Sequence, residues 1–338
     1  MDVNKNLFLN KKIILGKVNT TKDEIKRFKI TTDDILLTRT SETKKEIAYA
    51  SCLLDEVPNC VYSGFLLKAS PIKKELTYAP YITLLLHSPI YRNKLMKVST
   101  ETSRALINSD NLSGLNLLIP SITEQQKIFS LFSSLEIKIT NIEAKINILK
   151  KYKEGIEKYA YKFVENQGVS IKFSELFDNL IEKNNHNFQQ YTIGKNGIKK
   201  IDEINYDISN HKVFKKFNVI VGIGINEIGI NKDLEYGSVS PVYDVYNIRN
   251  LKYFDSIYVT LKEQLWKKRN FITRKSTRRE FEVDKYELKK MILKVVDNKD
   301  FANVYQSITN IKKAIEILNV SFNNLKILKA YILRHMFI

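Results

Sequence analysis

The sequence is constrained most by a stripe of apolar residues that occurs twice. Within each stripe the apolar residues are separated alternately by four and three positions, as along the seam between two packed helices. Lys and Glu fill the outer positions, which predicts long exposed helices. The second stripe repeats the first 176 positions later. The first consists of Ile128, Phe132, Leu135, Ile139, Ile142, Ile146 and Leu149, and the second of Val304, Ile308, Ile311, Ile315, Leu318, Phe322 and Leu325.

Other landmarks recur at similar offsets and predict a tandem duplication of a globular unit followed by a long helix. The matched pairs are Arg104 and Asp110 with Arg278 and Asp284, Ser63 with Ser240, and the apolar runs 35–37 with 219–221. The alternative is two unrelated domains that each end in an amphipathic helix.

The patterns between the two stripes predict a mixed α/β fold. The expected domains are 1–120, 121–165 as a first spacer helix, 166–298, and 299–338 as a second spacer helix. The first unit has fewer residues ahead of its first apolar run than the second, so we expect it to be short at its N-terminus. The expected helices cover 22–28, 80–96 with a break at Pro89, 173–181 and the later part of 253–266, and the expected strands cover 35–39, 47–54, 60–68, 115–119, 217–221, 242–245 and 291–296.

The net charge points to a polyanionic partner. Lys and Arg number 55 against 37 Asp and Glu, which gives +18 and favours nucleic acid. A Lys-rich composition of the kind that AT-rich genomes produce explains part of this excess. Cys52 and Cys60 are too few for a zinc site and indicate a reducing compartment. No signal peptide or long apolar run is present, so we expect a cytoplasmic protein.

The strongest nucleic-acid signal is the run KKRNFITRKSTRR, in which seven of thirteen residues are basic. The alternative is a solvated charged face. The candidate contacts in this run are Lys267, Lys268, Arg269, Arg274, Lys275, Arg278 and Arg279.

Further candidates lie in three loops. Arg104 is the counterpart of Arg278, so the two predict a shared phosphate-positioning role, unless each pairs with Asp110 or Asp284. Polar donors also follow the first strand and lie between two glycines of the second unit, where plain turn chemistry is the alternative. These donors are Arg39, Thr40, Ser41, Lys44 and Lys45 in the first unit and Lys195 and Asn196 in the second.

No pattern predicts catalysis or a metal site. Gly222 and Gly224 follow a strand, but a dinucleotide-binding loop needs a further glycine where Glu227 stands. There is no phosphate-binding lysine loop and no Asn/Asp-Pro-Pro-aromatic sequence, and the four His are scattered.

The opening of the first long helix, Pro120-Ser-Ile-Thr-Glu-Gln-Gln-Lys-Ile128, resembles that of the specificity (S) subunit of type I restriction–modification systems. The later run 149–153 and the runs 34–41, 103–107 and 239–243 resemble the same family. The second long helix lacks this opening. The resemblance implies two target-recognition domains, each reading half of a bipartite double-stranded DNA site, separated by two antiparallel coiled-coil helices.

The resemblance also implies that the chain is non-catalytic and docks two modification (methyltransferase) subunits and, in the full complex, restriction subunits. S-adenosylmethionine, ATP and Mg would belong to those partners, and this chain would hold no cofactor. Two alternatives are a stand-alone or decoy DNA-binding protein without enzyme partners, and a coiled-coil scaffold whose charge is incidental.

Overall fold

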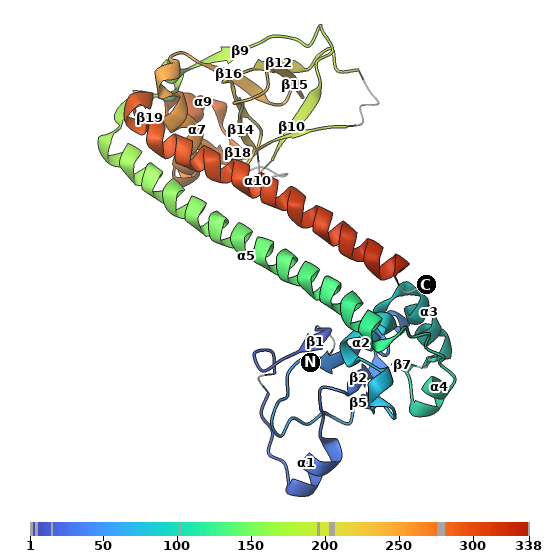
Figure 1. Cartoon of the computed structure of the whole chain (residues 1–338). Coiled ribbons are helices and arrows are strands. Elements are labelled where there is room, and N and C mark those ends of the chain that lie inside the picture. Colours follow the sequence, from blue (N-terminus) through green and yellow to red (C-terminus); the bar gives the residue numbers. More distant parts are fainter. Residues whose placement is uncertain are drawn as a thin grey trace. The chain divides into compact units, whose positions relative to one another are not determined.

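Two compact units share a pair of long helices. The computed structural model describes residues 3, 6–14, 16–101, 103–194, 197–202, 207–275 and 281–336. Unit 1 comprises Met1–Lys145 with Leu318–Ile338, and unit 2 comprises Ile146–Ile317. The helices α5 (Ile122–Gln167) and α10 (Asn298–His335) each contribute to both units (Figure 1).

Unit 1 is built on a four-stranded sheet with the order β1-β4-β2-β5. The strands are β1 (Phe8–Leu9), β2 (Ile35–Thr38), β4 (Ala50–Leu53) and β5 (Leu66–Ala69). The central strand β2 is antiparallel to both neighbours, and all four of its side chains are buried. The helices α2 (Ala79–His87) and α3 (Pro89–Val98) pack on this sheet, and their apolar side chains join those of β2 and β4 in one core.

The remaining elements of unit 1 are short. They are α1 (Lys22–Phe28), β3 (Thr40–Ser41), the 3-10 turns η1 (Lys44–Glu46) and η2 (Lys74–Leu76), β6 (Thr100–Glu101), β7 (Ala105–Leu106) and α4 (Ser109–Ser113). Strands β3, β7 and β6 form a separate small antiparallel sheet.

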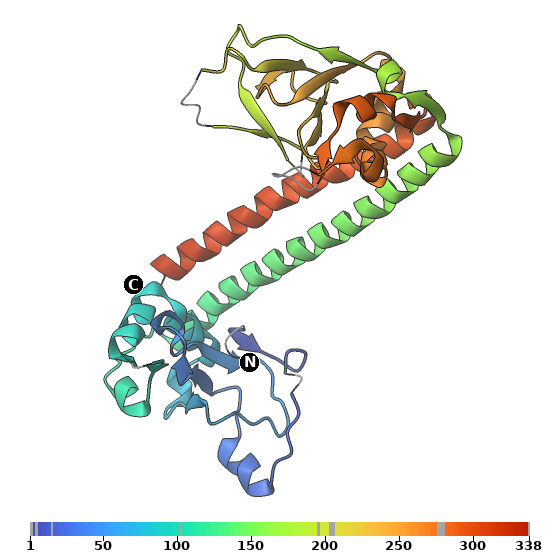
Figure 2. The same cartoon turned by 180° about the vertical axis from the view of Figure 1, so that it is seen from behind.

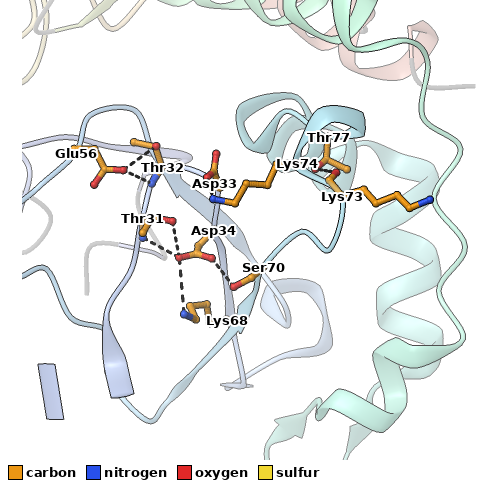
Figure 3. A network of polar contacts seen from close by, with 10 residues as sticks. All are labelled: Thr31, Thr32, Asp33, Asp34, Glu56, Lys68, Ser70, Lys73, Lys74 and Thr77. Carbon is orange, nitrogen blue, oxygen red and sulfur yellow. Dashed lines mark hydrogen bonds and ion pairs between the residues drawn. The ribbon is translucent and has the colours of Figure 1, made fainter. Parts of the chain in front are cut away.

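The turn into β2 is held by the buried carboxylate of Asp34 (Figure 3). It accepts hydrogen bonds from the N–H and the hydroxyl of Thr31, at 2.8 and 3.0 Å, and from the hydroxyl of Ser70 at 2.5 Å. Lys68 lies 3.9 Å from the same carboxylate. Because Lys68 and Ser70 belong to the β5 edge, this network fixes where β2 and β5 begin to pair.

Unit 2 contains two four-stranded sheets. The first has the order β14-β13-β16-β9 and consists of β9 (Phe177–Leu180), β13 (Val219–Val221), β14 (Ile228–Ile230) and β16 (Asp244–Ile248). The second has the order β11-β10-β15-β12 and consists of β10 (Gln190–Gly194), β11 (Gly197–Lys200), β12 (Lys212–Lys215) and β15 (Tyr236–Val239). Figure 2 shows these strands in yellow-green, beside the orange helices of unit 2.

The other elements of unit 2 follow or flank these sheets. They are β8 (Val169–Lys172), α6 (Phe173–Leu176), η3 (Leu251–Tyr253), α7 (Phe254–Lys267), α8 (Arg269–Ile272), β17 (Thr273–Arg274), β18 (Glu282–Val283), α9 (Lys285–Lys290) and β19 (Ile292–Val295). Strand β19 pairs with β8, directly before α10 begins.

The two units repeat the same core topology, so the predicted duplication is present in the fold. The antiparallel triplet β4-β2-β5 of unit 1 corresponds to β14-β13-β16 of unit 2. In both units a pair of helices follows (α2 and α3, or α7 and α8), then a short hairpin, a short capped helix and a long helix. Within the described residues, the sheet β11-β10-β15-β12 has no counterpart in unit 1.

The long helices run antiparallel, because opposite ends meet in each unit. In unit 1, Phe132 near the start of α5 shares a core with Ile332 near the end of α10. In unit 2, Val164 near the end of α5 shares a core with Phe301 near the start of α10. All fourteen residues of the two apolar stripes are buried or half-buried.

The start of α5 is fixed by the residues of the Pro-x-x-x-Glu-Gln opening. Ser121 and Glu124 form a capping box, with the Ser121 hydroxyl donating to the Glu124 carboxylate at 2.7 Å. The side chain of Gln125 is fully buried and accepts a hydrogen bond from the Tyr78 N–H at 2.9 Å. Its amide donates to the carbonyls of Leu76 and Pro120. The motif therefore ties α5 to the start of α2.

At the start of α10 another amide makes the equivalent connection. Asn298 accepts a hydrogen bond from the N–H of Asp255 at 3.1 Å and donates to the carbonyl of Leu251 at 3.0 Å. Asp255 lies at the start of α7, which corresponds to α2, and Leu251 lies in η3 directly before it. The second helix lacks the Pro-x-x-x-Glu-Gln opening but keeps this connection.

Three of the expected elements are wrong, and two expected strands have other bounds: 47–54 narrows to β4, and 242–245 begins later, as β16. Residues 115–119 are not a strand; the N–H of Leu118 donates to the hydroxyl of Tyr91 instead of to a neighbouring strand. The expected helix 173–181 ends at Leu176 and continues as β9, because β16 offers that segment a pairing edge. The expected strand 60–68 narrows to β5, since the chain turns at Ser63, whose carbonyl accepts from the Leu66 N–H. The helix 22–28 and the break before Pro89 are confirmed.

Candidate nucleic-acid interface

A three-stranded sheet in unit 1 gathers candidates that lie far apart in the sequence. Ser41 of β3 pairs with Ala105 of β7, next to Arg104. The backbone of Arg39 accepts from the Ile107 N–H at 3.0 Å and donates to Phe65 at 3.1 Å. The side chains of Arg39 and Arg104 are both exposed. The loop after β2 and the Arg104 hairpin therefore form one surface.

Of the two lysines beside this surface, Lys44 forms an ion pair and Lys45 is exposed. The partner of Lys44, which lies in η1, is Glu101 of β6, at 3.6 Å. The loop itself is shaped by Arg92 of α3, whose guanidinium donates to the carbonyls of Lys45, at 3.0 Å, and of Ile47 and Ala48. Arg92 therefore supports the loop from inside the unit.

Unit 2 contains the same arrangement. Strands β17 and β18 form a hairpin, and Gly224 bridges to Glu282 of β18, just as β3 pairs with β7. Gly224 follows β13 as Ser41 follows β2. The glycine pair singled out after β13 thus lines the hairpin rather than a dinucleotide loop. Arg278 and Arg279, like Lys195 and Asn196, lie outside the described residues.

Each hairpin leads into a short capped helix. The Asn108 side chain accepts from the Asn111 N–H at 2.8 Å at the start of α4. Asp284 accepts from the N–H groups of Tyr286 and Glu287 at the start of α9. Asn108 and Asp284 are 176 positions apart, as the apolar stripes are, so Asn108 and not Asp110 is the counterpart of Asp284.

Within the described residues, Arg104 forms no ion pair with Asp110. Its side chain is exposed, and Asp110 lies in α4, where its backbone carbonyl accepts from the Ser113 hydroxyl. The Asp284 carboxylate is used as a helix cap. The exposed guanidinium of Arg104 is therefore available to a ligand.

The first part of the basic run contacts the protein itself. The ammonium of Lys267 lies 3.5 Å from the centre of the Tyr161 ring of α5, and that of Lys268 donates to the Ile292 carbonyl at 2.7 Å. Arg269 stacks on Trp266, 4.6 Å from the ring centre. These residues hold the end of α7 in place, and their role in nucleic-acid binding stays a prediction.

The second part of the run lies on the hairpin. Arg274 of β17 pairs with Glu282 of β18 at 3.2 Å, and Lys275 is exposed. Beside the hairpin, the buried carboxylate of Asp244 contacts Lys285 of α9 at 2.7 Å and Lys212 of β12 at 3.0 Å. Burial opposes ionisation of this carboxylate, but the two ammonium groups outweigh it and hold its pKa below the usual value.

The sequence patterns did not single out Phe65. The residue is 68% exposed, and its backbone carbonyl accepts from the N–H of Arg39. An exposed aromatic ring is suited to stack on bases. The turn sequence Ser63-Gly64-Phe65 is the signal that would have indicated it, because it places an aromatic residue at a loop tip.

The geometry of the two units can be compared with known structures. No family model matches the chain, and no curated protein matches it in sequence. The crystal structure of the S subunit of the type I restriction–modification system from M. genitalium matches it with a TM-score of 0.55. The match covers 98% of this chain and 88% of that chain, at 11% identity. This chain has the fold of a type I S subunit.

Two further solved structures are similar to the chain. The HsdS subunit from Thermoanaerobacter tengcongensis has a TM-score of 0.44 and 12% identity, over 90% of this chain and 80% of that chain. A structure described for complex assembly and conformational transition of the type I R-M system has the same TM-score and 11% identity, over 90% and 81%. The M. genitalium structure alone confirms the S-subunit resemblance of the sequence for the fold.

The described residues were also compared with the features of metal sites and membrane spans. Among the described residues, no group of three His, Cys, Asp or Glu side chains is placed to hold a metal ion. None of the described helices is both long and apolar enough to cross a membrane.

Proposed function

We propose that this chain is a DNA-specificity subunit that binds a bipartite double-stranded site and has no catalytic role of its own. The observation that carries the proposal is the repetition, within an S-subunit fold, of a hairpin that is flanked by basic residues and paired with the segment directly after β2 or β13. Each hairpin would place cations against phosphates, and the loops beside it would contact base edges. Each unit would then read one half of the site.

Docking of modification subunits is supported by apolar side chains on the solvent side of the long helices. In unit 1, Ile137 and Ile327 are 58% and 67% exposed. In unit 2, Ile148 and Tyr152 are 65% and 62% exposed. Exposed apolar side chains repeated along two helices fit the buried centre of a protein interface.

The partners would supply the chemistry. Two modification subunits would bring S-adenosylmethionine and methylate adenine, and restriction subunits would bring the ATP- and Mg-dependent steps. This chain would hold no cofactor and would determine which DNA is modified.

Adenine-methylation mapping tests the proposal directly. The chain would be co-expressed with modification subunits encoded beside it, and the DNA would be sequenced with a method that detects methyladenine. We expect a new motif in two halves with a fixed gap. Co-expression of the modification subunits alone is the control, and an unchanged methylation pattern would contradict the proposed function.

A pull-down distinguishes the proposed function from the main alternative, a stand-alone DNA-binding protein. Replacing Ile148 and Tyr152 by Asp should release the modification subunits while duplex binding persists. If no modification subunit associates with the unmodified chain, and duplex binding is sequence-specific, the stand-alone alternative holds. Equal affinity for every duplex would instead favour the scaffold.

A further inference from the structure

Unit 2 contains a groove of about 1060 Å³ that the proposed DNA-reading surface does not use. Its walls are α5 between Lys153 and Glu165, the C-terminal half of α7, and the loop 230–234 after β14, with Lys312 of α10 at one side. Seven lysines line it against five acidic residues.

Four of these lysines, one each from α5, the loop after β14, α7 and α10, define what we call the lysine groove. They are Lys153, Lys232, Lys262 and Lys312. The ammonium of Lys312 lies 4.6 Å from the centre of the Tyr258 ring and 3.5 Å from its hydroxyl. The ammonium of Lys232 lies 6.0 Å from the same ring and 4.8 Å from that of Tyr305.

The positive charge of this cluster is only partly balanced: Glu157 acts electrostatically on Lys262 and Lys312, and Glu316 acts on Lys312, without forming ion pairs with them. Among the described residues, Lys232, Lys262 and Lys312 form no ion pair, and only Lys153 has an acidic partner, Glu157, at 3.2 Å. The ring contacts and the Thr309 hydroxyl, 3.4 Å from Lys232, orient the ammonium groups but carry no full negative charge.

Desolvation and neighbouring lysines lower the pKa values of two lysines of the groove. Desolvation in the groove lowers the pKa of Lys262, and the ammonium of Lys312 lowers it further. Desolvation also lowers the pKa of Lys312, where Lys153 and Lys232 add to the effect against Glu157. Like charges held this close destabilise each other unless an anion lies between them.

We propose that the lysine groove binds a phosphate group, independently of the proposed reading of DNA by the hairpins. A tetrahedral dianion accepts several charge-assisted hydrogen bonds at once, and the ammonium groups of the lysine groove, which come from three helices and a loop, would be its donors. The phosphate would come from a free nucleotide or pyrophosphate, or from the backbone of a nucleic acid.

The alternative is that these lysines are solvated and bind no ligand. Surface lysines are common in this chain, and Glu154 and Asp233 also line the groove. What distinguishes this cluster is that two of its ammonium groups are oriented on one aromatic ring, while the adjacent Lys313 of α10 is exposed and outside the groove.

The test is calorimetric titration of the full chain. Sodium pyrophosphate, ATP and a DNA duplex of arbitrary sequence are used as separate probes. The double variant Lys262→Gln/Lys312→Gln removes two groove charges. The matched control, Lys299→Gln/Lys313→Gln, removes two exposed charges from α10 outside the groove. We expect the groove variant to weaken binding about tenfold or more, which corresponds to about one charge-assisted hydrogen bond, and the control less than about twofold.

Each outcome decides the proposal. Pyrophosphate or ATP binding that the groove variant selectively weakens identifies a free phosphate as a ligand. Selective weakening of duplex binding alone identifies the DNA backbone as the source. Equal weakening in both double variants, or no binding to any probe, overturns the proposal. Thermal melting of the unmodified chain with and without pyrophosphate serves as an independent readout, because a bound anion must raise the melting temperature.

Discussion

Gln125 connects the first long helix to the start of α2 through the backbone N–H of Tyr78, at 2.9 Å. Asn298 makes the equivalent connection for the second long helix, although it is the first residue of α10 and Gln125 is the fourth of α5. The two units thus preserve a hydrogen-bonding role rather than a residue or a position. We infer that these amides determine where each helix leaves its unit.

Replacing Gln125 by Ala should lower the free energy of unfolding of unit 1 by about 2–3 kcal/mol. Three backbone groups lose a buried partner, and each unsatisfied group is costly. Urea titration measures the change, and Gln126→Ala is the control, because Gln126 is exposed and its loss should cost less than about 0.5 kcal/mol. Equal effects of the two substitutions would show that the connection is unimportant for stability.

Replacing Ile139 by Asp should destabilise the helix pair. Ile139 is only 7% exposed, so the substitution buries a charge without a partner and should cost several kcal/mol, about 3 or more. Ile137→Asp, two positions earlier at a 58% exposed site, should leave the thermal melting curve nearly unchanged. A melting temperature unaffected by Ile139→Asp would contradict a packed seam.

Replacing Arg104 by Ala should weaken DNA binding to all sequences similarly. If its guanidinium contacts one phosphate, the slope of log affinity against log salt should decrease by about one. Lys22→Ala, which removes an exposed charge from α1, is the control. Fluorescence anisotropy over a salt series provides the measurement. A loss of folding in the Arg104 variant would instead assign the residue a structural role.

Acidification should destabilise unit 1 through His87. Its ring is partly buried, and this burial lowers its pKa below that of the unfolded chain, which is about 6.5. The unfolded chain therefore binds a proton first, and the stability present above about pH 6.5 is lost as the pH falls toward the folded pKa. Urea titrations at about pH 7 and about pH 5 should show a smaller difference for His87→Gln than for the unmodified chain.

The control for this pH dependence is His335→Gln, since His335 is exposed at the end of α10. It should retain the pH dependence of the unmodified chain. If His87→Gln retains it as well, other groups cause the acid sensitivity.

The sequence predicted the long helices well because their signal is local. The four-and-three spacing of residues such as Phe132 and Ile308 indicates a helix and its buried face within a few turns, and every stripe residue is buried or half-buried. The predicted duplication followed from the same stripes. Residues 115–119 show the limit of this approach, because an apolar run becomes a strand only where a partner strand is available.

The candidate surface depended on contacts that no local pattern contains. Ser41 and Ala105 pair across a long sequence separation, so both segments could be named as candidates from the sequence, but their pairing in one sheet could not. Likewise, nothing near Lys267 indicates that Tyr161 of α5 lies against its ammonium. A basic run marks charge, and only the fold separates ammonium groups bound internally from those facing solvent.

The core of unit 1 is assembled from distant parts of the chain, since Ile332 of α10 packs with Phe132 and Leu135 of α5. During synthesis, the second half of the chain must leave the ribosome before this core can close. Until then, the apolar face of the first long helix stays exposed, and it offers a site for chaperones or for misassembly with another nascent copy. The first unit to be translated is therefore the last to be completed.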